Sequence, residues 1–249
     1  MFYDDRIVDK IEDLNGYSYW SFYAKNWRLS ERFMIQYQDK LDWSDISLYQ
    51  TLTEEFIRNF EHLVKWDLIS HTQKLSESFI EEFKDRVSWI NFSLFQTLSE
   101  SFIEKHQTQV DWESVCSTQK LSCDFMERFN DNLNWERVSE KQKLTEPFIL
   151  KYADKLNWNE MSKFQPYLSE DTLEKHFDKL NFARASRYQK LSESFIEAHC
   201  DKLEWHNISE YQKLSEEFIE KFQDKVRWNL ISEYQKLSES FIEKFEHRV

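Results

Sequence analysis

Glycine and proline are almost absent from this chain of 249 residues, which has one glycine, Gly16, and two prolines. A phosphate-binding loop, a dinucleotide fingerprint and a nucleophile elbow all need glycines at fixed spacing, so a single glycine excludes them. No histidine, serine or cysteine stands apart from the general pattern of the sequence with catalytic partners at a plausible spacing. We therefore predict that the protein is not an enzyme and that it has no catalytic residues and no cofactor.

Cysteine and long apolar runs are also scarce, and the 46 acidic residues outnumber the 33 basic ones. The three cysteines, Cys116, Cys123 and Cys200, give no disulfide framework, which indicates a reducing compartment. No apolar run is long enough to span a membrane and the start has no secretory leader pattern, so we expect a cytoplasmic protein with no membrane partner. The formal net charge of −13 predicts no nucleic-acid partner, because phosphate binding needs a positive surface.

A block of 23 residues recurs in register along almost the whole chain, and it reads most clearly at 214–236 as LSEEFIEKFQDKVRWNLISEYQK. The blocks open at Leu29, Leu52, Leu75, Leu98, Leu121, Leu144, Leu168, Leu191, Leu214 and Leu237. Every step is 23 residues except the step from Leu144 to Leu168, which is 24. A fixed period of this kind predicts a stacked repeat array, and such arrays are usually binding scaffolds.

Each block is predicted to form two short helices. Ser or Thr follows the opening leucine and can cap the first helix, and a glutamate in its first turn suits the positive end of the helix dipole. Asp or Asn often precedes the recurring tryptophan and can cap the second helix. In the second helix Trp228, Ile231, Ser232 and Gln235 share one face. Helices this short are not stable alone, so the blocks must stabilise one another by stacking.

The predicted fold is all-α: an α-solenoid of 23-residue two-helix repeats, with about nine full units, a divergent N-terminal cap and a C-terminal half-repeat. Residues 1–28 form the cap, residues 29–165 a first arm and residues 166–249 a second arm. The boundary is a register break at Pro166, where an extra residue and smaller core residues predict a bend.

The polar residues that recur are predicted to have structural roles. Gln ends nearly every second helix, and Ser recurs three places earlier; the amide would satisfy backbone groups between blocks and the small serine would allow close helix approach. His106, His176 and His199 occupy a position that is Phe or Tyr in other blocks. Equivalent positions in neighbouring blocks are about 10 Å apart, too far for histidines to share one ion, so we predict no metal site.

Binding residues should lie where the blocks differ. The second helix is predicted to expose the two residues after its tryptophan and the residue after its serine. In the first three blocks these places are rich in apolar residues, and Leu48, Leu68, Ile90 and Leu94, flanked by Tyr49 and Phe95, would form an exposed strip that marks a protein interface. The alternative is that these residues fold under the N-terminal cap or lie half-buried between blocks. Lys163, Arg184 and Arg187 form a small basic group, which we predict to be a second contact.

The C-terminal half-block, from Leu237 to Val249, keeps the apolar residues Phe241, Ile242 and Phe245 and has no polar outer face. Terminal repeats normally need such a face. Either the open side pairs with a second copy, which would form a homodimer through these three residues, or the native protein continues beyond Val249.

The shared text L-S-E-x-F-I-x-x-F-x-D-K-V-x-W-x-x-I-S-x-Y-Q-K, over residues 29–249, resembles tandem repeats in uncharacterised proteins of giant, mimivirus-like DNA viruses. The block at Leu168 matches it least well. The resemblance implies a virus-encoded protein that acts in the cytoplasm of the infected host or in the virion, and it brings no known functional residues.

Taken together, these features predict a non-enzymatic repeat scaffold that binds another protein, of unknown identity, through the exposed surface of its second helices. The alternative is a structural or virion assembly protein that self-associates through its open C-terminal repeat.

Overall fold

The computed structural model describes residues 17–165 and 168–248 of the chain. Within these ranges all regular structure is helical and no strand is present. Helices alternate in pairs with the 23-residue period of the sequence, and second helices of successive blocks contact each other. The predicted all-α repeat fold is therefore confirmed.

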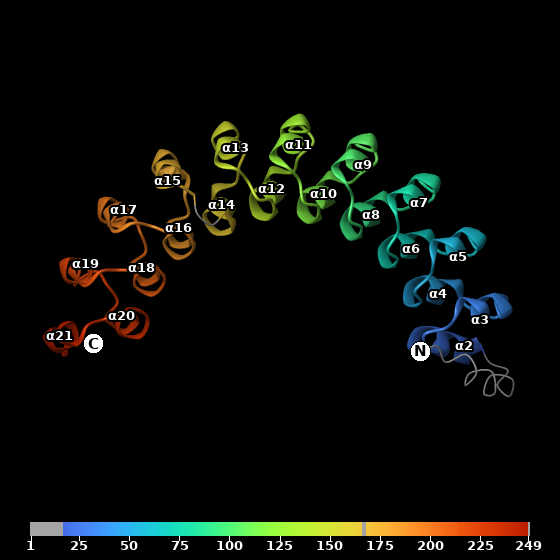
Figure 1. The fold of residues 1–249 in the computed structure, drawn as a ribbon, viewed down its shortest axis with the longest axis horizontal. Coiled ribbons are helices and arrows are strands. Elements are labelled where there is room, and N and C mark those ends of the chain that lie inside the picture. Colours follow the sequence, from blue (N-terminus) through green and yellow to red (C-terminus); the bar gives the residue numbers. More distant parts are fainter. Residues whose placement is uncertain (1–16, 166–167, 249) are drawn as a thin grey trace. The chain divides into compact units, whose positions relative to one another are not determined.

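The chain divides into two compact units, residues 1–119 and 120–249. In the first unit the second helices are α2 (Tyr17–Asn26), α4 (Trp43–Tyr49), α6 (Trp66–Thr72), α8 (Trp89–Phe95) and α10 (Trp112–Thr118). The first helices are α3 (Glu31–Gln36), α5 (Glu54–Asn59), α7 (Glu77–Glu82) and α9 (Glu100–Lys105). The two kinds of helix form two rows within the unit, and the second helices are the row packed side by side (Figure 1).

The second unit repeats this arrangement. Its first helices are α11 (Cys123–Arg128), α13 (Glu146–Lys151), α15 (Glu170–Lys175), α17 (Glu193–Ala198), α19 (Glu216–Lys221) and α21 (Glu239–Lys244). Its second helices are α12 (Trp135–Lys141), α14 (Trp158–Phe164), α16 (Phe182–Tyr188), α18 (Trp205–Tyr211) and α20 (Trp228–Tyr234), and a short 3-10 helix, η1 (Phe177–Lys179), follows α15. Most of the predicted cap, and the predicted break at Pro166, lie outside the described residues.

Side-chain caps begin the helices at the predicted places. Ser30 Oγ accepts the N–H of Phe33 at 3.1 Å, and serines or threonines act in the same way before α5, α7, α9 and most first helices of the second unit. Asp42 Oδ1 accepts the N–H of Ser44 at 2.7 Å to begin α4. Each cap satisfies an amide that the first helical turn leaves without a partner.

Aromatic stacking joins each second helix to the next first helix. The Trp43 ring centroid lies 6.0 Å from that of Phe56 and 5.2 Å from that of Phe60. The same arrangement recurs at Trp66, Trp89, Trp135, Trp205 and Trp228. The indole N–H donates to a backbone carbonyl five residues earlier, as Trp43 does to Gln38 at 3.0 Å. The tryptophans therefore pack the array and do not form a stacking platform for a ligand.

A buried glutamine clamps each loop of the array. Oε1 of Gln73 accepts the N–H of Leu52 at 3.0 Å, and its Nε2 donates to the carbonyl of Gln50 at 2.8 Å. The bond to a leucine N–H recurs at Gln50, Gln73, Gln96, Gln119, Gln142, Gln165, Gln189, Gln212 and Gln235. Each glutamine therefore satisfies the loop of the preceding block, as the sequence predicted, and the loops need no glycine.

The recurring serine adds a second link. Ser47 Oγ donates to the carbonyl of Trp43 at 2.6 Å and accepts the N–H of Lys65, just before the next second helix, at 2.9 Å. Ser70, Ser139, Ser186 and Ser209 make the same pair of bonds. A hydroxyl is small enough to be buried between two helices while it bonds to both.

Replacing Gln73 with Leu tests the clamp. The variant leaves the N–H of Leu52 and the carbonyl of Gln50 buried without partners, and an orphaned buried group costs about 1–3 kcal/mol, so we expect a loss of about 2–4 kcal/mol in the free energy of unfolding. Urea denaturation measures it. Gln107→Leu, at an exposed position of the same unit, is the control and should shift stability by less than about 0.5 kcal/mol. Equal effects of the two changes would contradict a structural role for the clamp.

Candidate functional site

The structure divides the three predicted surface positions of the second helix into exposed and packed ones. The residue after the tryptophan is exposed in nearly every block, as at Asp67, Ile90 and Asn159. The next residue was predicted to be exposed, and this is wrong: Asp45, Ser114 and Leu230 are buried and the others are half-buried. The reason is the close packing of neighbouring second helices.

Hydrogen bonds show how this second position is used. Asn91 Nδ2 donates to the carbonyl of Asp67 on α6 at 3.1 Å, and Asn207 Nδ2 donates to the carbonyl of Ala183 on α16 at 3.0 Å. In both cases a side chain of one second helix bonds to the backbone of the preceding one. This position therefore links neighbouring second helices, and of the three predicted positions the residue after the tryptophan and the residue after the serine remain for a partner.

The predicted apolar strip of the first unit is concentrated on α8. Ile90, Leu94 and Phe95 are 63%, 37% and 48% exposed. Leu48 and Leu68 are half-buried, as the alternative interpretation of the strip proposed for them, whereas Tyr49 on α4 is exposed. Between these helices α6 presents the exposed His71, whose ring centroid is 4.1 Å from that of Phe95.

A column of aromatic residues lies next to the glutamine column and was only partly recognised in the sequence. Tyr49 and Phe95 were identified, but the exposed Tyr188, Tyr211 and Tyr234 at the same position of α16, α18 and α20 were missed. A signal for them is present in the recurring text Tyr-Gln-Lys. It points to a surface role only once the structure shows that the residue before the buried glutamine faces outward.

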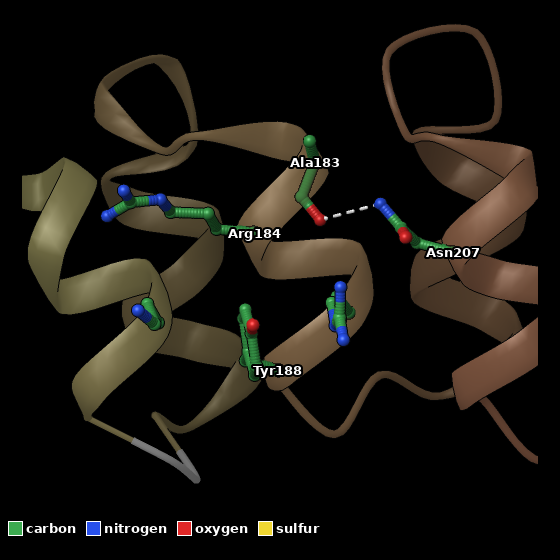
Figure 2. Close-up of a pocket in the computed structure, with 6 residues that line it drawn as sticks. Ala183, Arg184, Tyr188 and Asn207 are labelled. Atoms are coloured by element: carbon green, nitrogen blue, oxygen red, sulfur yellow. Dashed lines mark hydrogen bonds between the residues drawn. The ribbon is translucent and has the colours of Figure 1, made fainter.

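The predicted basic residues line one cavity of the second unit. Lys163, Arg184 and Arg187 come together with Ala183, Tyr188 and Asn207 around a volume of about 290 Å³. Figure 2 shows Arg184 extending from α16 toward α14, where its Nη1 donates to Glu160 at 2.9 Å, while Asn207 reaches Ala183 from α18. The structure therefore brings the three basic residues to a single site.

The C-terminal residues predicted for self-association differ in exposure. Phe241 and Phe245 are buried against Trp228, with ring centroids 6.5 Å and 5.0 Å from it, so the prediction that they lie on an open surface is wrong. They cover the last tryptophan, as Phe56 and Phe60 cover Trp43. Ile242 is 42% exposed, although its counterparts, such as Ile57 and Ile219, are 0% exposed.

Two of the histidines considered as metal ligands pack within the aromatic column of the first helices. His106 and His199 stack in the aromatic position and bond to Glu81 and Glu174, at 2.7 Å and 2.6 Å. Across the described residues no group of three or more His, Cys, Asp or Glu side chains is arranged to hold a metal ion. In the same part of the chain, no helix combines the length and apolar character needed to cross a membrane.

No family model, curated protein or solved structure matches the chain. Its function is therefore inferred from the surfaces just described: the exposed apolar residues of α8, the basic cavity of the second unit with its neighbouring tyrosines, and Ile242.

His176 gives a pH-dependent stability that can be tested. Its ring stacks on Trp158 and its Nε2 is buried without a hydrogen-bond partner. Burial lowers the pKa of His176, and Lys179 and Lys175 lower it further, while Asp154 acts in the opposite direction. With the folded pKa below the ordinary value of about 6.5, the unfolded state binds the proton more readily, so stability falls as pH decreases through that range.

His176→Phe, which restores the residue found at this position in other blocks, should therefore reduce the loss of stability between pH 7.5 and pH 5.5. The measurement is the urea midpoint of both proteins at the two pH values. If the wild type and the variant lost stability in parallel, His176 would not be a source of the pH dependence.

Proposed function

We propose that the protein is a non-enzymatic repeat scaffold that binds another protein through the exposed face of its second helices. The observation that carries this proposal is the exposure of Ile90, Leu94 and Phe95 together on α8. Exposed apolar residues that gather on one helix favour an interface, whereas singly scattered ones need no explanation.

The stack does not require apolar side chains at these places. At the positions of Ile90 and Leu94, α10 carries Glu113 and Ser117, and α12 carries Glu136 and Glu140. α12 keeps the same tryptophan, serine and glutamine columns as α8, and α10 differs only at the serine position, where it has Cys116. The apolar residues of α8 are therefore available for recognition, and the array would be more soluble without them.

The proposed place of action is a reducing compartment, the cytoplasm, because the three cysteines form no disulfide. On the repeat resemblance, this is the host cytoplasm or the virion of a giant virus. The proposed partner is a protein rather than a nucleic acid or a membrane.

Ile90→Asp combined with Leu94→Asp tests the proposal. We expect the variant to fold, because α12 already carries two glutamates at these positions, and to lose binding of its partner by at least about tenfold, since two buried apolar contacts are replaced by charges. A partner is first identified by affinity capture from an extract of cells that express the protein. It is then purified, and calorimetry measures its affinity for both proteins.

The matched control is Ser117→Asp, which gives α10 two acidic residues at the same positions, because Glu113 is already present. Its affinity for the purified partner should stay within about twofold of wild type, since an isolated surface charge contributes little. Equal affinity of the wild type and the α8 variant would rule out α8 as the anchor.

Self-association is the second candidate function, and the exposure of Ile242 is the observation that favours it. Among the described residues no side chain accepts the N–H of Leu237 or donates to the carbonyl of Gln235, although a glutamine does both at the corresponding loops. The assembly proposed here pairs two identical end faces through Ile242.

Ile242→Asp tests this alternative. If the end faces pair, sedimentation equilibrium of the wild type at high concentration will give a mass above that of the monomer, and the variant will be monomeric. Ile35→Asp, an equally drastic change at an exposed isoleucine of the first unit, should leave the mass unchanged. A monomeric wild type, or the same mass for all three proteins, would exclude this mode of assembly.

A further inference from the structure

The basic cavity of the second unit is formed by three consecutive second helices, α14, α16 and α18. Lys163 comes from α14, Arg184, Arg187 and Tyr188 from α16, and Asn207 from α18. The polar contacts of Arg184 and Asn207 link these helices in pairs, which fixes the walls of the cavity (Figure 2).

The three cations of the cavity are not equivalent. Arg184 is paired with Glu160 at 2.9 Å and donates to the carbonyl of Asn159 at 3.1 Å, so it is held in place and partly neutralised. Lys163 and Arg187 make no ion pair with the described residues; they lie over aromatic rings, with Lys163 Nζ 4.3 Å from the Phe164 centroid and the Arg187 guanidinium 4.6 Å from that of Tyr211. Two uncompensated positive charges thus face one cavity.

The charges beside the cavity limit the size of the anion that it can take. The position of Lys163 and Arg187, one residue after the recurring serine, is Glu140 on α12, Glu210 on α18 and Glu233 on α20. Two cations therefore lie between acidic residues in one row. A polyanion that follows the row would meet these carboxylates, whereas a compact anion at the two cations would not.

The tyrosines next to the cavity indicate a polypeptide ligand. The Arg187 guanidinium lies near both Tyr188 and Tyr211, at 5.2 Å and 4.6 Å from their centroids, and both rings are exposed. Tyr and Arg are the side chains most enriched in the energetically important parts of protein interfaces. The anion therefore enters a surface that can also contact the residues around it.

We propose that this cavity binds the phosphoryl group of a phosphorylated residue in a partner protein. A phosphate monoester carries a charge of about −1.5 to −2 at neutral pH, which matches two cations, and its oxygens accept several hydrogen bonds from lysine and arginine. The inference rests on the proposed function, because it names a chemical feature of the partner, but it concerns residues of the other unit.

The test uses the full chain and degenerate peptide libraries with a central phosphoserine, phosphothreonine or phosphotyrosine, together with the same libraries carrying the unmodified residue or glutamate. Peptides selected from these libraries are synthesised, and fluorescence anisotropy measures their affinity for the protein. We expect phosphorylated peptides to bind at least about tenfold more tightly than their unmodified forms, because hydrogen bonds between charged groups are stronger than those between neutral ones. Lys163→Glu with Arg187→Glu should remove that preference.

The matched control is Lys190→Glu with Lys213→Glu, which changes the net charge equally at two exposed loop lysines of the same unit. It should keep the preference for phosphate. Equal losses in the two double variants, or no preference for phosphorylated peptides, would overturn the proposal. Binding only to phosphatidylcholine vesicles that contain phosphatidylinositol 4-phosphate, abolished by the Lys163 and Arg187 changes, would also overturn it and assign the cavity to a membrane headgroup.

The α8 variant separates this inference from the proposed function. Ile90→Asp with Leu94→Asp should bind the phosphorylated peptides as the wild type does, because its changes lie in the first unit. If the α8 variant lost the captured partner but the wild type bound no phosphopeptide, the phosphate site would be refuted and the proposed function would stand.

Discussion

The whole array depends on one buried side-chain amide per block. Apart from α2 and the three-residue η1, each described helix is six or seven residues long, which is too short to persist alone. Each second helix ends in a loop whose backbone groups need partners away from water. A glutamine from the next block supplies them, since its amide both accepts and donates. Leucine would fill the same space and satisfy neither group. Although the chain has one extra residue between Leu144 and Leu168, Gln189 donates to the carbonyl of Gln165 at 2.8 Å, so the glutamine bonds continue into the next block.

The ladder also determines which positions are free for recognition. Tryptophan, serine, glutamine and the second residue after the tryptophan bond or pack between blocks, so exchanging them would weaken the stack. The residue after the tryptophan, the residue after the serine and the residue before the glutamine differ from block to block. In the first unit α8 presents exposed apolar residues at these places, and in the second unit α14, α16 and α18 bring basic residues and a tyrosine together around one cavity. A single repeat can therefore present different chemistry in each unit without a change of fold.

The sequence was sufficient for the architecture because local and repeated signals agree. The caps at Ser30 and Asp42, the helical period and the role of glutamine all follow from spacing within one or two blocks. The surface was harder to predict, because it depends on how closely neighbouring helices pack. Because neighbouring second helices pack closely, Leu230 is buried and Leu68 is half-buried, although an isolated helix would leave both side chains exposed. Phe241 and Phe245 were misplaced for a related reason: the tryptophan they cover belongs to the preceding block. The cavity around Arg187 is formed by side chains from three helices, so no short sequence motif predicts it.

The net charge of −13 conceals how the charges are distributed between the two helical rows. Glutamates in the first turn of the first helices accept the N–H of the next cap residue, as Glu31 does from Thr53 at 2.8 Å and Glu54 from Ser76 at 2.6 Å. Many of the acidic residues therefore help to stack the first helices on one another. In the other row, Lys163 and Arg187 are flanked by Glu140 and Glu210, so a positive site survives on an acidic protein while its neighbours repel an extended polyanion. We propose that this local arrangement disfavours an extended nucleic acid and still leaves room for a single compact anion.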